Sequence, residues 1–165
     1  MSNDSVWLGT NCENFIDEIV IYSSNTDELV KEIKTRYPDR QIIVYPDPAC
    51  KQRKTSAGGK TDLNILQNAG LTVRVKNAHP QVRDRINAVN SRLKNTNDQR
   101  MMFIDPKCKN IIRGLERHLY KEGTTQPDKD SGFDHMNDAI GYAVDYLFPI
   151  RKQYTKQLPQ RWSIK

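Results

Sequence analysis

The sequence has few cysteines, no long apolar run and no export signal. Its three cysteines, Cys12, Cys50 and Cys108, form no CxxC pair, which argues against a disulfide framework and a cysteine-ligated zinc site. The apolar stretch at residues 140–150 is interrupted by polar residues and too short to span a bilayer. No basic-then-apolar segment opens the chain. These absences predict a cytoplasmic protein with reduced cysteines and no membrane partner.

The composition is that of a globular domain with a basic balance. The chain has 165 residues, of which 36% are hydrophobic and 28% charged, enough for one domain with its own core. A formal charge of +6 favours a polyanionic partner such as nucleic acid, although charge alone leaves this open. The basic residues are densest around Lys51, Arg53, Lys54 and Lys60. A cluster of this size is most often a solvated loop.

Strand-like and helix-like segments alternate along the chain. Apolar, β-branched runs predict strands at residues 15–22, 41–45, 71–75 and 101–104. Cap residues and helical spacing predict helices from residue 26 to before Pro38, then at 62–69, 80–93, 108–121 and 134–148. This order favours an α/β sandwich with helices on both sheet faces. We expect one domain at 13–150, a tail or remnant edge strand at 1–12, and a basic tail at 151–165.

Asp47 follows the predicted strand at 41–45 and stands between Pro46 and Pro48. Open α/β sheets bind ligands beyond the carboxyl ends of their strands. The two prolines restrict the backbone on both sides of this carboxylate. Asp47 is therefore either a positioned ligand or the solvated aspartate of a Pro-Asp-Pro turn.

A second group of polar residues opens the last predicted helix, in the stretch "SGFDHMNDAIGY". Asp134 and Asp138 are four residues apart and so share a helix face, and His135 neighbours Asp138. A helix N-cap explains Asp134. Asp138 lies too far inside for a cap, and its structural alternative is an interaction with the positive end of the helix. His135 is either an assistant to a site or an ordinary polar residue.

Paired carboxylates from a strand end and a helix start suit a divalent cation. Mg²⁺ is usually held by one or two carboxylates together with water and substrate phosphate. Two such ions activate water and stabilise the leaving oxygen in phosphodiester cleavage. Asp47 and Asp138 are the candidate ligands of this site, and His135 is the candidate for tuning it or assisting proton transfer.

Several segments resemble the nuclease domain of phage large terminase subunits. The similar segments, in order over roughly residues 13–150, are "FIDEIVIYSSNTDELVKEI", "VYPDPA", a basic Ser/Gly loop with "TDLNILQNAGL", and "FDHMNDAIGY". The resemblance implies a ribonuclease H-like mixed sheet flanked by helices. It also implies an endonuclease that uses Mg²⁺ or Mn²⁺ to cut concatemeric double-stranded DNA during packaging. Its implied partners are the terminase ATPase domain, the small terminase subunit and the portal.

The resemblance also assigns residues by position. Asp47 matches the second catalytic acid of the family, Asp138 the third, and His135 the histidine three residues before it. Asp134 matches the pattern as a support of the metal site. The loop residues Lys51, Arg53, Lys54 and Lys60 would then contact DNA phosphates, without sequence preference.

The chain departs from the family pattern at its start. No residue matches the first catalytic acid: Asp4 lies in a dissimilar segment, and Glu18 matches an acid that is not the usual ligand. The phosphate-binding pattern GxxxxGK[ST] is also missing. We therefore expect an N-terminally truncated nuclease domain that lacks the first strands. The alternatives are a catalytically impaired DNA-binding or packaging-interaction module and another ribonuclease H-like enzyme, such as a junction resolvase.

Overall fold

The computed structural model describes residues 12–21, 25–53, 60–124, 127–128 and 132–150. Lys54, residues 1–11 of the expected N-terminal tail and the basic tail at 151–165 lie outside these ranges. No helix in the described part of the chain is long and apolar enough to cross a bilayer.

Helices and strands alternate as expected. The elements, in chain order, are β1 (Glu13–Phe15), α1 (Thr26–Arg36), β2 (Ile43–Val44), the 3₁₀ helix η1 (Pro48–Lys51), α2 (Asp62–Asn68), β3 (Thr72–Val73), α3 (Val82–Leu93), β4 (Met102–Ile104), α4 (Lys109–Arg117) and α5 (Asp134–Leu147). In the described part, β1 pairs with β4 and β2 with β3, both in parallel. The α/β class is thus confirmed, but these strands form two small parallel sheets where one mixed sheet was expected.

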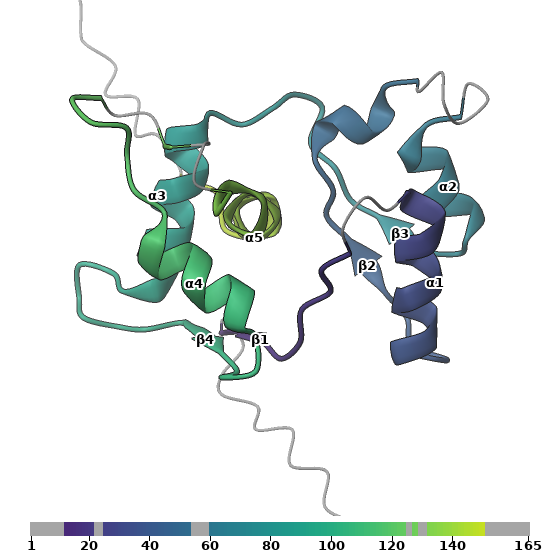
Figure 1. The fold of residues 1–165 in the computed structure, drawn as a ribbon, viewed down its shortest axis with the longest axis horizontal. Coiled ribbons are helices and arrows are strands. Elements are labelled where there is room, and N and C mark those ends of the chain that lie inside the picture. Colours follow the sequence, from purple (N-terminus) through teal and green to yellow (C-terminus); the bar gives the residue numbers. More distant parts are fainter. Residues whose placement is uncertain (1–11, 22–24, 54–59, 125–126, 129–131, 151–165) are drawn as a thin grey trace, which may run out of the picture.

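The elements gather into two halves (Figure 1). The larger half contains β1, β4, α3, α4 and α5, and its buried apolar residues are Ala88, Val89, Met102, Cys108, Ile111, Ile140 and Val144. The smaller half contains β2, β3, η1, α1 and α2, and its buried apolar cluster is Val30, Leu66 and Leu71. Each half therefore has its own core.

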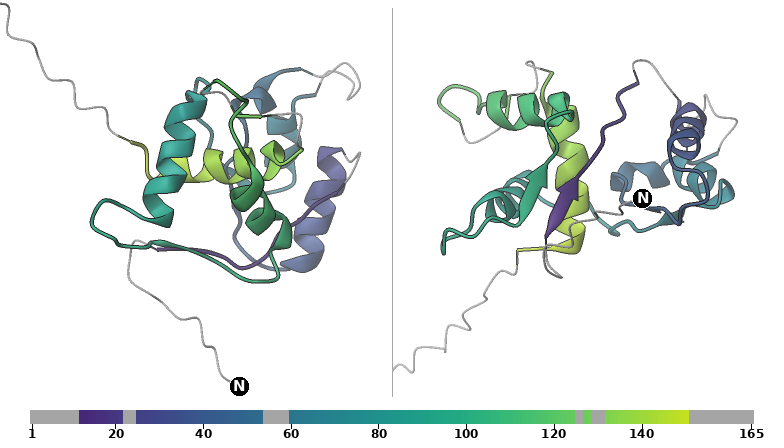
Figure 2. Two further views of the ribbon diagram at one scale, coloured as in Figure 1. Left: turned by 60° about the vertical axis from the view of Figure 1, so that its left-hand side comes forward. Right: turned by 90° about the horizontal axis from the view of Figure 1, so that it is seen from below.

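Helix α5 joins the halves. It packs against α3 and α4, and β1 and β4 lie side by side along it (Figure 2). Toward the smaller half, the ring of Tyr146 lies 5.1 Å from that of Tyr45, centroid to centroid. Asp145, which is 3% exposed, forms an ion pair with Lys76, and Lys76 Nζ also donates to the Asp145 carbonyl at 2.9 Å. Residues of α5 consequently fix the strand ends of the smaller half.

Local signals set the ends of the helices in the smaller half. Asn25 accepts a hydrogen bond from the amide of Glu28, and Thr61 accepts one from the amide of Asn64, so both are N-caps as expected. Gly70 follows α2 with a φ of 80°, a conformation that glycine adopts without strain. The predicted limits of α1 and α2 are confirmed.

Three expectations are wrong in detail. The strand predicted at 15–22 is limited to β1, and the following residues 16–21 form no ladder. Helix α4 ends at Arg117, and Tyr120 instead forms an antiparallel bridge with Pro127. Asp134 is the first residue of α5 and not its cap, because the cap position is Phe133 and no side-chain cap bond is present among the described residues.

All three cysteines are free, as expected. Cys108 is fully buried beneath β1, where its Sγ lies 3.6 Å from the Phe15 carbonyl. Burial raises the pKa of the Cys108 and Cys50 thiols. Both behave as small apolar core residues.

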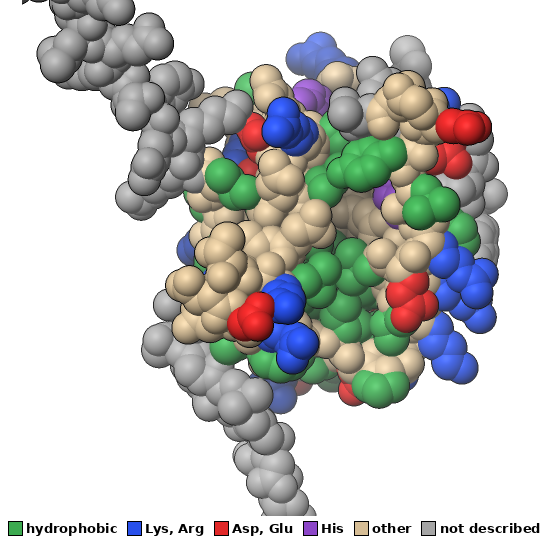
Figure 3. Space-filling view, turned by 90° about the vertical axis from the view of Figure 1, so that its left-hand side faces the viewer, with side chains coloured by type: hydrophobic (Ala, Val, Ile, Leu, Met, Phe, Trp, Pro, Cys, Tyr) green, Lys and Arg blue, Asp and Glu red, His purple; other side chains and the backbone are tan. Residues whose placement is uncertain are grey.

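A pocket opens on the outer face of the larger half, between α3, α4 and α5. Its apolar wall includes Val82, Ile86 and Leu119, and Figure 3 shows hydrophobic side chains gathered around a hollow on this face. On its polar side, His118 Nε2 donates to the carbonyl of residue 128, and its Nδ1 accepts from Asn137 Nδ2, both at 2.9 Å. Asp138 borders the same pocket.

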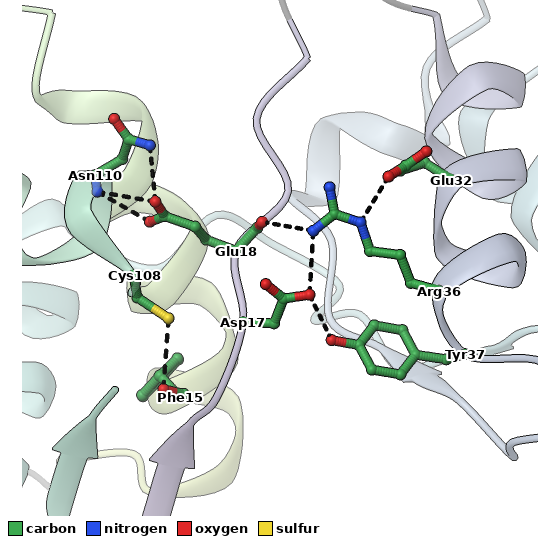
Figure 4. Close-up of polar contacts among 8 residues, drawn as sticks. All are labelled: Phe15, Asp17, Glu18, Glu32, Arg36, Tyr37, Cys108 and Asn110. Atoms are coloured by element: carbon green, nitrogen blue, oxygen red, sulfur yellow. Dashed lines mark hydrogen bonds and ion pairs between the residues drawn. The ribbon is translucent and has the colours of Figure 1, made fainter. Parts of the chain in front are cut away.

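The segment after β1 ties the halves together through adjacent acidic residues (Figure 4). Asp17 accepts hydrogen bonds from Tyr37 Oη (2.7 Å) and Arg36 (3.1 Å) at the end of α1. Glu18 points the other way and accepts from the amides of Asn110 and Ile111 at the start of α4, at 2.9–3.0 Å. The side chains of Asp17 and Glu18 thus bond to opposite halves of the molecule. In a strand of a half-buried sheet, one of two such neighbours would face the core and the other would face solvent.

Candidate functional site

Asp47 lies at the carboxyl end of β2, where η1 begins. Its Oδ1 accepts a hydrogen bond from the amide of Ala49 at 2.7 Å and so caps η1. The proline at position 48 opens η1, where its missing amide costs nothing. The flanking prolines and this cap give the carboxylate a defined position after β2, where the sequence placed it.

Tyr142 of α5 reaches Asp47 from the larger half. Its hydroxyl donates to Asp47 Oδ2 at 2.8 Å. Burial, followed by this hydrogen bond to a carboxylate, raises the pKa of Tyr142 to about 12. Tyr142 therefore remains a protonated donor at neutral pH.

Asp138 lies one turn into α5 and pairs with a buried arginine. Arg85 of α3 is 6% exposed, and its NH1 group lies 2.8 Å from Asp138 Oδ1. The same guanidinium stacks over the ring of Tyr142, 4.3 Å from its centroid. A β-carbon at Gly141 would lie 3.5 Å from the Arg85 β-carbon, an ordinary van der Waals distance, so α3 and α5 pack closely here.

These contacts connect the two candidate carboxylates. The chain of contacts runs from Asp47 to Tyr142 by a hydrogen bond, to Arg85 by stacking, and to Asp138 by an ion pair. We call these four residues the carboxylate chain. The residues that the sequence singled out on a strand end and on a helix start thus belong to one connected polar arrangement.

His79 is a further neighbour of Asp47. Its Nδ1 lies 3.3 Å from Asp47 Oδ1, and its side chain is half exposed. Sequence reasoning missed this residue, although it follows β3 at the same sheet edge where Asp47 follows β2. The sequence could have indicated His79, because a histidine in the loop after a parallel strand lies at the sheet edge where ligands usually bind.

Asp134 and His135 occupy different environments from Asp138. The side chain of His135 is 90% exposed, and its Nε2 lies 3.9 Å from Asp134 Oδ1. Asp134 is largely buried, and its Oδ1 has no hydrogen-bond partner among the described residues. The structure brings Asp47 and Asp138 into one arrangement and leaves His135 in solvent, so the roles of Asp134 and His135 stay predictions.

The two carboxylates of the carboxylate chain suit a hard divalent cation. The Asp47 and Asp138 side chains are 45% and 42% exposed, so solvent reaches both. Carboxylate oxygens plus water form the usual ligand set of Mg²⁺. The described residues contain no cluster of three or more potential ligands. Each acid thus has the donor chemistry and the solvent access that such an ion needs, and the binding of one ion by both acids stays a prediction.

Asp17 and Glu18 do not replace the missing first acid. Their carboxylates are occupied by Tyr37 and Arg36 on one side and by the start of α4 on the other. Glu18 additionally accepts from Asn110 Nδ2 at 2.8 Å. The acid at position 18 that matches the family pattern therefore supports the fold.

The basic residues proposed for DNA contact differ in how far protein contacts already engage their side chains. Lys51 Nζ donates to the Lys76 carbonyl at 3.0 Å and lies 3.3 Å from Asn77 Oδ1, so this lysine ties η1 to the segment after β3. Arg53 and Lys60 are exposed, and the backbone of Arg53 bridges that of Thr61. Their DNA contacts stay a prediction.

The chain belongs to the terminase RNaseH-like domain family, whose model matches residues 10–147. It is similar in fold to the large terminase of a thermophilic bacteriophage (crystal form 3), with 22% identity, 74% coverage of this chain and a TM-score of 0.51. The complex of that terminase with ADP gives 23% identity, 76% coverage and a TM-score of 0.53. The chain spans 28% and 29% of those two chains. No curated protein matches it. The expected terminase resemblance and ribonuclease H-like fold are thereby confirmed.

Proposed function

We propose that this chain is a metal-dependent endonuclease domain that cuts concatemeric double-stranded DNA during phage genome packaging. The observation that carries the proposal is the carboxylate chain, in which Asp47 and Asp138 share one polar arrangement within a terminase RNaseH-like domain. Both acids lie where chemistry is usual in such folds, at a strand end and at the helix start beside it.

The two acids and their neighbours have distinct roles in this proposal. Asp47 and Asp138 would hold Mg²⁺ or Mn²⁺, and Asp134 would support Asp138 from the preceding turn. The metal, when bound, supplies an activated water and stabilises the leaving oxygen. Tyr142 and the amide of Ala49 fix the two oxygens of Asp47, so its carboxylate is oriented before substrate arrives. His79 and His135 are the candidates for moving protons near neutral pH.

DNA would lie against exposed basic residues near Asp47. Arg53 and Lys60 are exposed, and Lys54 belongs to the same basic loop. Lys51 would act through its hold on the segment after β3, with less freedom to reach phosphate. Such contacts are independent of sequence and weaken as the salt concentration rises.

The remaining partners follow from the family. We place the chain in the host cytoplasm, working with a terminase ATPase domain, a small terminase subunit and a portal. Since the chain spans under a third of the phage terminase chains that it matches, these functions would reside outside this sequence.

The test is nicking of supercoiled plasmid with Mg²⁺ or Mn²⁺. Asp47→Asn and Asp138→Asn should each abolish nicking, because an amide is a poor ligand for a hard divalent cation. Asp98→Asn is the matched control: Asp98 is exposed, its carboxylate pairs with Lys94, and it has a φ of 60° that asparagine tolerates. Nicking that persists in both site variants would refute the assignment.

A second function, DNA binding without cleavage, is favoured by one observation. The described residues contain no group of three or more potential metal ligands, and protein donors already engage both Asp47 and Asp138. This alternative predicts salt-sensitive retention of linear duplex DNA in a gel-shift assay with no nicking in either metal. Preference for branched over linear DNA would instead indicate a junction resolvase.

A further inference from the structure

Helix α3 carries two buried arginines seven residues apart. Arg85 pairs with Asp138 and stacks on Tyr142, and Arg92 pairs with Glu13 and stacks on Phe148 at 4.1 Å. The exposed fractions of Arg85 and Arg92 are 6% and 7%. They therefore share a helix, a degree of burial and a pattern of contacts.

The two ion pairs differ on the carboxylate side. Glu13 is 12% exposed and receives two bonds from Arg92, to Oε2 at 3.0 Å and to Oε1 at 2.8 Å. This bidentate pair closes a gap in the core and leaves its carboxylate little access to solvent. Asp138 is 42% exposed and receives one bond from Arg85 NH1.

The Arg85 guanidinium also keeps unused hydrogen-bonding capacity. Its Nε is buried and has no partner within the described part of the chain. A buried charge without full hydrogen bonding is costly, so a purely structural arginine would be expected to resemble Arg92. The Asp138 carboxylate is open to solvent and the Arg85 guanidinium is incompletely hydrogen-bonded. This ion pair can therefore be broken and formed again more easily than the pair of Arg92 with Glu13.

We propose that Arg85 occupies the cation position at Asp138 and competes there with the divalent metal. This inference rests on the proposed function, in which Asp138 is a metal ligand. Arg85 is a positioning residue: it holds the Asp138 carboxylate and the Tyr142 ring in place, and it lowers the affinity for a second cation. A divalent ion then binds Asp138 against the repulsion of the guanidinium, or displaces it from Oδ1.

The proposal predicts tighter metal binding when the guanidinium is removed. Arg85→Gln should lower the Kd for Mn²⁺ by at least about fivefold, the factor that a unit charge about 4 Å away produces even in the dielectric of water. Arg85→Lys keeps the charge and should stay within about twofold of the parent. Arg92→Gln, the matched control, removes the same charge from the same helix about 10 Å along its axis and should leave the Kd unchanged.

Mn²⁺ binding is measured by electron paramagnetic resonance of the free ion, at a temperature where circular dichroism shows each variant folded. If Arg92→Gln is not folded there, Arg36→Gln, which also removes one positive charge away from Asp138, replaces it. An unchanged or higher Kd in Arg85→Gln, or an equal decrease in Arg92→Gln, would overturn the proposal. A lower Kd in Arg85→Gln without plasmid nicking by any variant would support competition at Asp138 while refuting the proposed nuclease function.

Discussion

In the larger half, seven buried apolar residues and the enclosed Arg92–Glu13 pair hold α3, β4 and α5 together. In the smaller half, three buried apolar residues form the core, and Arg36 pairs with Asp17 and Glu32 at the surface. Asp138 belongs to the larger half and Asp47 to the smaller half. Asp47 takes its local position from its prolines and its η1 cap, whereas its position relative to Asp138 depends on the contacts that Tyr142 and Asp145 of α5 make with the smaller half.

The largest effect is expected from the buried ion pair of the larger half. Arg92→Met leaves Glu13 buried without its guanidinium and should lower the free energy of unfolding by about 3–5 kcal/mol. Arg36→Met removes an exposed pair in the smaller half and should lower the free energy of unfolding far less, because solvent screens such pairs. Urea unfolding followed by circular dichroism measures both. Equal losses would show that the two halves do not differ in this way.

The next largest effect is expected from core substitutions, which test whether the two halves unfold independently. Leu66→Ala removes the most buried side chain of the smaller core and should cost about 2–3 kcal/mol. Because this core has few members, amide hydrogens of α1 and α2 should exchange faster while those of α3 and α5 keep their protection. Val144→Ala in the larger half serves as the converse control, with loss of protection in α3 and α5. Uniform loss of protection in both variants would argue for a single cooperative unit.

A smaller effect is expected from the residues that cap helices. Glu18 caps α4 from a distant part of the chain, and Asn25 caps α1 from the adjacent position. Glu18→Ala removes charged hydrogen bonds at the start of α4 and should cost about 2 kcal/mol. Asn25→Ala removes the neutral cap of α1 and should cost about 1 kcal/mol. Urea midpoints give both values, and Glu18→Gln, which keeps one acceptor oxygen, should lie between Glu18→Ala and the parent. The comparison fails if Glu18→Ala is as stable as the parent.

The smallest effect is a pH dependence at Asp17, the residue before Glu18. The hydrogen bond from Tyr37, and then the contact with Arg36, lower the pKa of Asp17 from 3.8. Since the pKa is lower in the folded than in the unfolded chain, Asp17 stabilises the fold above about pH 4, and this contribution is lost as the pH falls through the folded pKa. Thermal melts should show the parent more stable than Asp17→Asn at about pH 6 and the difference shrinking below about pH 4. A difference that stays constant with pH would contradict this assignment.

What the sequence predicted correctly depended on neighbours along the chain. Asn25, Thr61 and Gly70 act within one turn, so the limits of α1 and α2 were predictable from their types alone. The position of Asp47 after β2 followed from the two prolines in the same way. Asp138 was placed correctly inside α5 by helical spacing.

What the sequence left out depended on partners distant in the chain. Residues 16–21 were predicted as strand because the run is β-branched and apolar, whereas Asp17 and Glu18 take partners in opposite halves. The contacts of Tyr142 with Asp47 and of Arg85 with Asp138 arise only once α5 packs between the halves. Arg85 itself left a signal, since it falls within the apolar stripe of α3. A charge in such a stripe requires an anionic partner.

The pairing of β1 with β4 has a consequence for the order in which the chain folds. The smaller half is encoded by one uninterrupted stretch from α1 to β3, so its contacts can form as soon as that stretch has been synthesised. β1 precedes this stretch but pairs with a strand that follows it, and closing so long a loop slows folding. We therefore expect the docking of β1 onto β4 to be a late step of folding. The segment after β1, with Asp17 and Glu18, can join the two halves only once that step is complete.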